Sequence, residues 1–196
     1  MVEDYSSWTL VGLVQRQAEA HGAREFMSFE HGTTLTFSSL HRDSDDLARK
    51  LGGLGVTPGD LVMVILKNRI EFILVMWAIM KLGAIFVPIN TELKGAFLQH
   101  QMRNAEPRVV FLDAVLGNAF DAVIGGNENL VATIYVAGDV PDRRPDVLSG
   151  VPAMTFEEFS GLAAHQGDVL VTPKPQDIAC IMYTSGTTGP SKGVLM

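Results

Sequence analysis

The feature that most constrains the fold is an alternation of short apolar runs with helical segments in the middle of the chain. Apolar runs at 61–66, 85–87 and 109–112 predict strands, and the segments 69–81 and 93–104 between them predict helices. Continuous apolar strands are typical of a parallel sheet buried on both faces, because such strands have no polar side to turn toward water. The sequence therefore predicts an α/β fold with a mostly parallel sheet flanked by helices.

Local signals extend this unit on both sides. Phe26–Phe29 and Thr33–Thr36 predict a hairpin, and Thr36 is expected to cap a helix from Phe37 to Leu51. Further along we expect a helix at 114–123, a strand at 131–136, a loop at 138–152, a helix at 155–164 begun by a Thr155–Glu158 capping box, a connector at 167–176 and a last strand at 178–184.

Composition excludes several classes of protein. The chain has 196 residues, of which 47% are hydrophobic and 19% charged, so it can order itself around a core. A net charge of -7 gives no general attraction to nucleic acid, which we do not expect as a partner. The longest uninterrupted apolar run, 72–80, is too short to span a bilayer, which needs about 20 residues. With one cysteine, Cys180, and no apolar leader after Met1, a cytoplasmic location is expected.

The segment YTSGTTGPSKGV, residues 183–194, has the composition of a phosphate-binding loop. It places five Ser and Thr hydroxyls, three glycines and one lysine between two apolar runs. Glycines let backbone N–H groups approach an anion, hydroxyls donate further hydrogen bonds, and lysine supplies a positive charge. We call residues 183–194 the candidate phosphate loop.

Other glycine motifs do not fit this segment. Gly186, Gly189 and Lys192 lack the G-x-x-x-x-G-K-[ST] spacing of kinases and GTPases, and the G-x-G-x-x-G dinucleotide pattern is absent. Ser185 is not framed as a hydrolase nucleophile would be, in G-x-S-x-G. A plain flexible Gly/Ser turn is the alternative, but such a linker gains nothing from a lysine or from apolar runs on both sides.

The candidate phosphate loop closely resembles the signature loop of the adenylate-forming enzymes, which include acyl-CoA synthetases, luciferases and peptide-synthetase adenylation domains. GVTPGDLVMVILKNRIEF, MKLGAIFVPIN, NAEPRVVFLD and PQDIACIMYTSGTTG also resemble that family's N-terminal region, in the family's order. Two positions depart from the family: Ser191 stands where many members have proline, and Ser39 where glutamate often completes the first helix cap. The resemblance implies that residues 1–196 are the incomplete, truncated N-terminal part of the large adenylation domain.

The resemblance implies a two-step reaction. A carboxylate would attack the α-phosphate of Mg2+-bound ATP to give an acyl-adenylate and pyrophosphate, and a thiol, usually coenzyme A, would then displace AMP. The carboxylic acid would be a fatty or other organic acid. The residues implied to surround the β- and γ-phosphates are Thr184, Ser185, Gly186, Thr187, Thr188, Gly189 and Lys192.

Much of such an enzyme lies beyond residue 196, including the C-terminal catalytic domain with its catalytic lysine. Three interpretations therefore stay open: part of an acyl-CoA synthetase, part of an adenylation domain that loads a carrier protein, or a non-catalytic fragment. We expect the 196-residue chain alone to be inactive, and to associate with itself through an exposed sheet edge.

Other residue types give weaker signals. Asp45–Asp46 and Glu157–Glu158 are interpreted as solvated helix faces, Cys180 as a buried apolar residue, and Met76, Trp77 and Met80 as core side chains rather than an acyl pocket. No metal site is predicted, because the histidines have no metal-ligand spacing; they are His21, His31, His41, His100 and His165.

Overall fold

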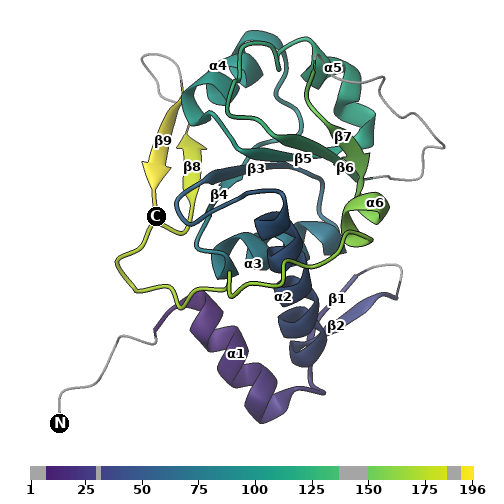
Figure 1. Cartoon of the computed structure of the whole chain (residues 1–196), viewed down its shortest axis with the longest axis vertical. Helices are drawn as coiled ribbons and strands as arrows, with labels where there is room; N and C mark the ends of the chain where they lie inside the picture. Colours follow the sequence, from purple (N-terminus) through teal and green to yellow (C-terminus); the bar gives the residue numbers. More distant parts are fainter. Residues whose placement is uncertain (1–7, 30–31, 137–149, 185–190) are drawn as a thin grey trace.

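The computed structural model describes residues 8–29, 32–136, 150–184 and 191–196. Its centre is a five-stranded parallel sheet with strand order β4-β3-β5-β6-β7 (Figure 1). Two antiparallel pairs are separate from it: β8–β9 lies next to β4, and β1–β2 contacts α2. The strands are β1 Glu25–Ser28, β2 Thr34–Thr36, β3 Leu61–Ile65, β4 Ile85–Pro88, β5 Val109–Asp113, β6 Ala132–Val136, β7 Ala153–Thr155, β8 Ile181–Thr184 and β9 Lys192–Leu195.

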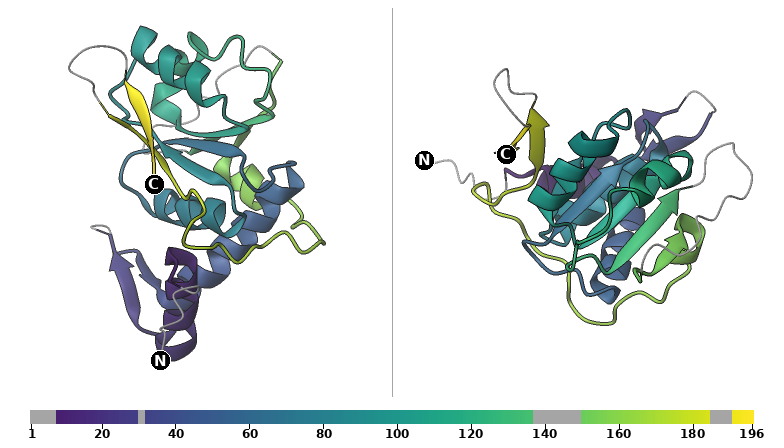
Figure 2. Two further views of the ribbon diagram at one scale, coloured as in Figure 1. Left: turned by 90° about the vertical axis from the view of Figure 1, so that its left-hand side faces the viewer. Right: turned by 90° about the horizontal axis from the view of Figure 1, so that it is seen from above.

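Helices cover both faces of the sheet, as the apolar strands predict (Figure 2). α2 and α3 pack on one face, with α1 against α2, while α4 and α5 cover the other face. The helices are α1 Leu10–His21, α2 Phe37–Gly53, α3 Ile70–Lys81, α4 Gly95–Ala105, the 3-10 turn η2 Ala114–Leu116, α5 Gly117–Asp121 and α6 Phe156–Ser160. The predicted α/β class and the three layers are confirmed.

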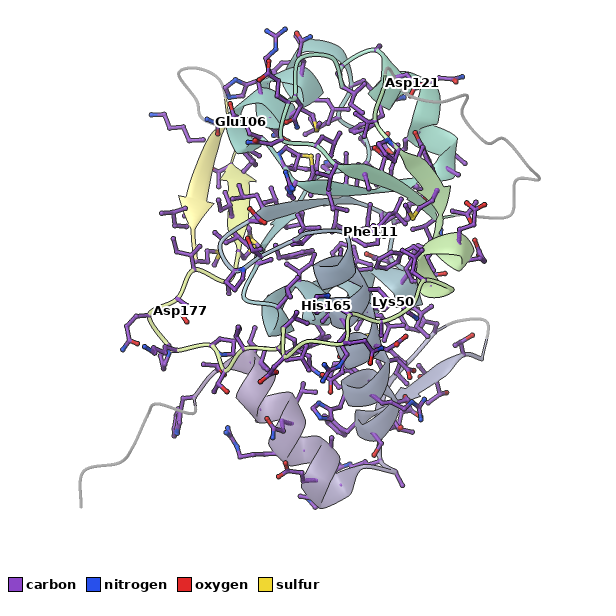
Figure 3. The ribbon with its side chains drawn as sticks, viewed as in Figure 1. Lys50, Glu106, Phe111, Asp121, His165 and Asp177 are labelled. Atoms are coloured by element: carbon purple, nitrogen blue, oxygen red, sulfur yellow. The ribbon has the colours of Figure 1, made fainter. Side chains whose placement is uncertain are left out.

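The strands are buried because each contributes side chains to two apolar clusters. Phe111 of β5 lies at the centre of the molecule and stacks edge-on against Phe159 of α6, with ring centroids 5.5 Å apart (Figure 3). The next residue, Leu112, points into the cluster beneath α4 and α5. Alternate residues of one strand thus serve opposite layers, which explains the uninterrupted apolar runs.

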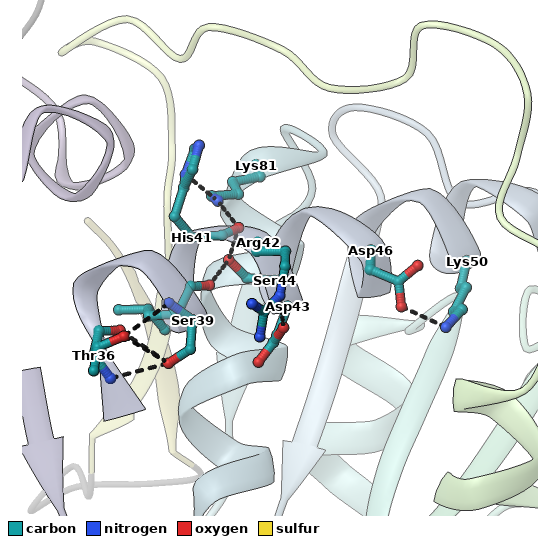
Figure 4. Close-up of polar contacts among 10 residues, drawn as sticks. Thr36, Ser39, His41, Arg42, Asp43, Ser44, Asp46, Lys50 and Lys81 are labelled. Atoms are coloured by element: carbon teal, nitrogen blue, oxygen red, sulfur yellow. Dashed lines mark hydrogen bonds and ion pairs between the residues drawn. The ribbon is translucent and has the colours of Figure 1, made fainter. Parts of the chain in front are cut away.

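Caps set the starts of two helices. Thr36 accepts a hydrogen bond from the Ser39 amide, and the Ser39 hydroxyl accepts one from the Thr36 amide at 2.9 Å (Figure 4). Serine therefore completes the capping box at the position where the family often has glutamate. Thr155 and Glu158 form the predicted capping box at the start of α6.

Several predicted boundaries were wrong. The helix expected at 155–164 ends at Ser160, where the Gly161 amide bonds back to Glu157 and Glu158 carbonyls. The helix expected at 114–123 is split into η2 and α5. Strand β7 lies just beyond the expected loop, most of which falls outside the described residues, and it is too short to give a pattern.

Helix α1 was not predicted at all. Thr9 caps it by accepting a hydrogen bond from the Gly12 amide at 3.1 Å. Val11 and Val14 are buried, but Leu10 and Leu13 are exposed. The buried apolar face is therefore narrow. Because apolar residues also lie on the exposed side, the sequence shows no clear helical periodicity here.

Candidate functional site

The candidate phosphate loop is mounted on the β8–β9 hairpin. Thr184 at the end of β8 is paired with Lys192 at the start of β9 in the antiparallel register. Side chains opposite one another across such a pair lie on the same face, and both of these are exposed. The two described members of the predicted site are thus brought together. Ser185, Gly186, Thr187, Thr188 and Gly189 lie outside the described residues.

The hairpin is joined to the edge of the main sheet at β4. Cys180 forms an isolated parallel bridge with Phe86, and the Phe86 amide donates to the Ala179 carbonyl at 3.0 Å. β8 therefore runs in the same direction as β4, and the loop follows its carboxyl end. Ligands of open α/β sheets bind outside the carboxyl ends of the strands, so this is the end of the sheet where an anion site is expected.

Alternate residues of β8 fix the hairpin against the fold. Ile181 and Tyr183 turn inward and pack on the apolar cluster under α4, while Met182 and Thr184 face outward. Gly193 lies opposite Tyr183, and a Cβ added there would come within 2.8 Å of the Ile181 side chain. Burial raises the pKa values of the Tyr183 phenol and the Cys180 thiol, so both stay protonated at neutral pH.

Helix α4 contacts both ends of the loop. The Tyr183 hydroxyl donates to Asn104 Oδ1 at 2.7 Å. His100 Nε2 lies 2.9 Å from the Ser191 carbonyl oxygen, and Gln101 Nε2 donates to the Ser191 hydroxyl at 3.1 Å. From its spacing His100 was not predicted to be a metal ligand, and no role was predicted for it or for Gln101 and Asn104. The spacing of residues 100, 101 and 104 places their side chains on one side of a helix, and this pattern could have indicated a shared contact.

Arg69 and Lys192 differ in whether other described side chains already pair with them. Arg69, which follows β3, is engaged by Glu71 at 2.8 Å and lies 3.9 Å from Asp113 at the end of β5. Among the described residues, the Lys192 ammonium makes no hydrogen bond or ion pair, and its side chain is exposed. Among the described residues of the hairpin, Lys192 is therefore the positively charged side chain that can bind an anionic ligand.

The other candidates have structural roles. Trp77 and Met80 are core residues of α3, as expected. A cavity of about 580 Å³ borders Met80, but it opens beside Gly59 and Gly83, at the amino ends of β3 and β4 and away from the loop. Asp45 does not lie on a merely solvated face, because it is bonded to the buried Lys81 ammonium at 2.6 Å.

Neither a metal-binding cluster nor a membrane-spanning helix is found among the described residues. No group of three or more His, Cys, Asp or Glu side chains is placed to hold a metal ion there. The described hairpin residues offer hydroxyl and ammonium groups and no carboxylate, so they fit phosphate oxygens rather than a metal cage. In the same parts of the chain, no helix is long and apolar enough to cross a membrane.

The chain is similar to known AMP-binding enzymes over most of its length. The family model described as AMP-binding enzyme matches residues 14–196. L-proline--[L-prolyl-carrier protein] ligase of Streptomyces coelicolor is 27% identical over 95% of the chain, and 2-succinylbenzoate--CoA ligase of Geobacillus kaustophilus is 32% identical over 83%. The chain spans only 34% and 28% of the lengths of these two relatives.

Solved structures show the same fold. The anthranilate CoA ligase AuaEII in complex with anthranoyl-AMP superposes with a TM-score of 0.78 at 23% identity. The match covers 97% of this chain and 34% of that one.

Proposed function

Because this chain belongs to the AMP-binding enzyme family, we propose that it supplies the phosphate-binding part of an ATP-dependent ligase that activates a carboxylic acid. The observation that supports this most directly is the pairing of Thr184 with Lys192, both exposed, at the carboxyl end of β8. A hydroxyl and an ammonium group on one face of a hairpin can both donate to a polyphosphate.

The first chemical step is formation of an acyl-adenylate. A carboxylate oxygen of the acid bonds to the α-phosphorus of ATP, the bond from that phosphorus to the bridging oxygen breaks, and pyrophosphate leaves. Negative charge develops on the departing pyrophosphate, where fixed donors stabilise it. We assign this role to Thr184, Ser185, Gly186, Thr187, Thr188, Gly189 and Lys192. Mg2+ enters as the complex with ATP, held by the phosphates themselves.

The second step moves the acyl group to a thiol. The thiol sulfur bonds to the acyl carbon, AMP leaves, and the thiol proton is lost to a base. We propose coenzyme A as the acceptor and a fatty or other organic acid as the substrate, in the cytoplasm. The 32% identical 2-succinylbenzoate--CoA ligase supports coenzyme A.

A carrier protein is the second candidate acceptor. The relative that matches 95% of the chain is a ligase for an L-prolyl-carrier protein. The two acceptors are separated by supplying the acyl-adenylate with either coenzyme A or a phosphopantetheinylated carrier protein and measuring AMP release.

We further propose that residues 1–196 form the N-terminal part of an adenylation domain, whose catalytic domain and lysine belong to a longer protein. The chain spans 34% and 28% of the lengths of the two relatives described above, so we expect the natural gene product to have a mass well above 21.2 kDa. Intact-mass measurement from the source cells tests this, and a product of 21.2 kDa would instead support the non-catalytic fragment.

The activity test is ATP–pyrophosphate exchange with a panel of carboxylic acids. We expect the full-length protein to exchange label only when its acid is present, and the 196-residue chain to show none. Exchange by the purified chain would contradict its proposed inactivity, whereas a full-length protein silent with every acid and binding no pyrophosphate would contradict the proposed function.

The chain alone is also proposed to self-associate through the hairpin. Met182, Val194 and Leu195 are 45%, 46% and 61% exposed on the hairpin. Exposed apolar strands of this kind favour edge-to-edge contacts. Light scattering at high concentration should detect oligomers, and a monomeric peak would contradict this proposal.

A further inference from the structure

Three polar side chains of α4 lie beside its apolar face and bond to the hairpin. Leu98, Met102 and Ala105 bury the helix against the sheet, which is sufficient to dock it. His100, Gln101 and Asn104 are not part of that apolar contact, yet each bonds to a residue of the loop. A helix that only covered the sheet would not require these bonds.

The three bonds are divided between the two ends of the loop. Asn104 holds Tyr183, the first residue of the loop, whereas His100 and Gln101 both hold Ser191, directly before Lys192. The hairpin is otherwise joined to the main sheet by the bridge between Cys180 and Phe86 and by packing of its inward side chains. The α4 bonds therefore fix the loop end of the hairpin, the part farthest from that bridge.

The chemistry of each bond is defined. A carbonyl oxygen only accepts, so the contact is a hydrogen bond that His100 Nε2–H donates to the Ser191 carbonyl oxygen. Gln101 is 4% exposed, and its Oε1 has no partner among the described residues although it is buried. That oxygen can accept another hydrogen bond without giving up an existing one, which suits a residue beside a binding loop.

We propose that His100, Gln101 and Asn104 are positioning residues that hold both ends of the candidate phosphate loop and thereby set its affinity for polyphosphate. The inference rests on the proposed function. Fixing the ends before the ligand arrives removes part of the ordering cost of binding. The residues act through Tyr183 and Ser191 and need not touch the ligand.

The first test measures binding of pyrophosphate with Mg2+ to the chain by isothermal titration calorimetry. His100→Ala and Tyr183→Phe should each weaken binding by about 5-fold, the value of one net hydrogen bond. His100→Gln, whose amide nitrogen can replace Nε2 as a donor, should restore affinity, which loss of packing alone would not allow. Gln99→Ala, on the same helix with no bond to the hairpin among the described residues, is the matched control.

The second test needs no ligand. Backbone amide exchange by NMR should be about 5-fold faster at Thr184 and Gly193 in His100→Ala, while amides of β3 and β5 are unchanged. Wild-type affinity and wild-type exchange in both His100→Ala and Tyr183→Phe would overturn the inference. A wild-type chain that binds no pyrophosphate would instead overturn the proposed phosphate-binding role of residues 1–196, and the exchange data would still decide whether α4 holds the hairpin.

Discussion

Lys81 and Lys192 carry the same ammonium group in opposite surroundings. The Lys81 side chain is 3% exposed between α2 and α3, and its ammonium lies 2.6 Å from Asp45 Oδ1 and 2.8 Å from the His41 carbonyl oxygen. Figure 4 shows this group against His41, one turn before Asp45 on α2. Lys192 is exposed on the hairpin without such partners among the described residues.

The difference separates polar groups that stabilise the fold from polar groups that are left for a ligand. Moving a charge out of water is costly, so a buried ammonium persists only where acceptors surround it. An exposed ammonium remains hydrated until an anion replaces its water. Between α2 and α3 the polar groups bond to one another, whereas the hairpin exposes its hydroxyl and ammonium groups to solvent.

The largest expected effect comes from replacing the buried lysine. Lys81→Met keeps the apolar stem but leaves Asp45 and the His41 carbonyl without their donor, so it should reduce the free energy of unfolding by about 3 kcal/mol. Lys192→Met should change stability by less than about 0.5 kcal/mol. Urea unfolding of the two variants measures both free energies, and equal losses of stability would contradict the different roles assigned to the two lysines.

The dependence of stability on alkaline pH gives a second test of the buried Lys81. Burial lowers the pKa of Lys81 below its ordinary 10.5, so the unfolded chain binds more protons in the interval between the folded value and 10.5. Stability of the wild type should therefore rise with pH across that interval, relative to Lys81→Met. A difference between the two proteins that stays constant with pH would contradict this assignment.

The second largest effect is on ligand affinity. Lys192→Met should weaken pyrophosphate binding by about 10- to 100-fold, the value of a charge-assisted hydrogen bond. Lys174→Met, which removes an equal charge from the exposed connector, is the control for general electrostatics. Calorimetry that finds equal losses in both variants would show that Lys192 acts only through net charge.

Thr36 and Thr184, each at the end of a strand, allow the same comparison of a structural and an exposed polar group, with a smaller expected effect. Thr36→Ala removes the cap of α2 and should reduce the free energy of unfolding by about 1 kcal/mol. Thr184→Ala removes an exposed hydroxyl and should alter stability by less than about 0.5 kcal/mol. Thermal unfolding distinguishes them, and a larger loss for Thr184→Ala would place that hydroxyl among the structural groups.

The smallest effect concerns the end of α4. Glu106 has a φ of 45°, in the left-handed region where a side chain is strained. Glu106→Gly should raise the free energy of unfolding by about 0.5 kcal/mol, because relief of strain outweighs the added freedom of the unfolded chain. Glu106→Ala removes the same carboxylate without relieving strain, and a gain of stability there would contradict this explanation.

The parallel sheet was predictable from the sequence because its strands are local apolar runs with helices between them. The runs at 61–66, 85–87 and 109–112 became β3, β4 and β5 with shifts of one residue at their ends. The Thr36 and Thr155 caps were also predictable, since both partners of a capping box lie within four residues. α1 and β7 were missed because one has a narrow apolar face and the other is only three residues long.

By itself the sequence determined the α/β class, the succession of central strands and helices along the chain and the chemical character of the loop, because periodicity, capping and composition are local properties of the chain. Only the tertiary structure decided that Thr184 and Lys192 face the same way, that α4 reaches Tyr183 and Ser191, and that Asp45 holds Lys81. These contacts join residues distant in the chain, such as His100 and Ser191. Their geometry depends on how layers pack, which no local pattern encodes.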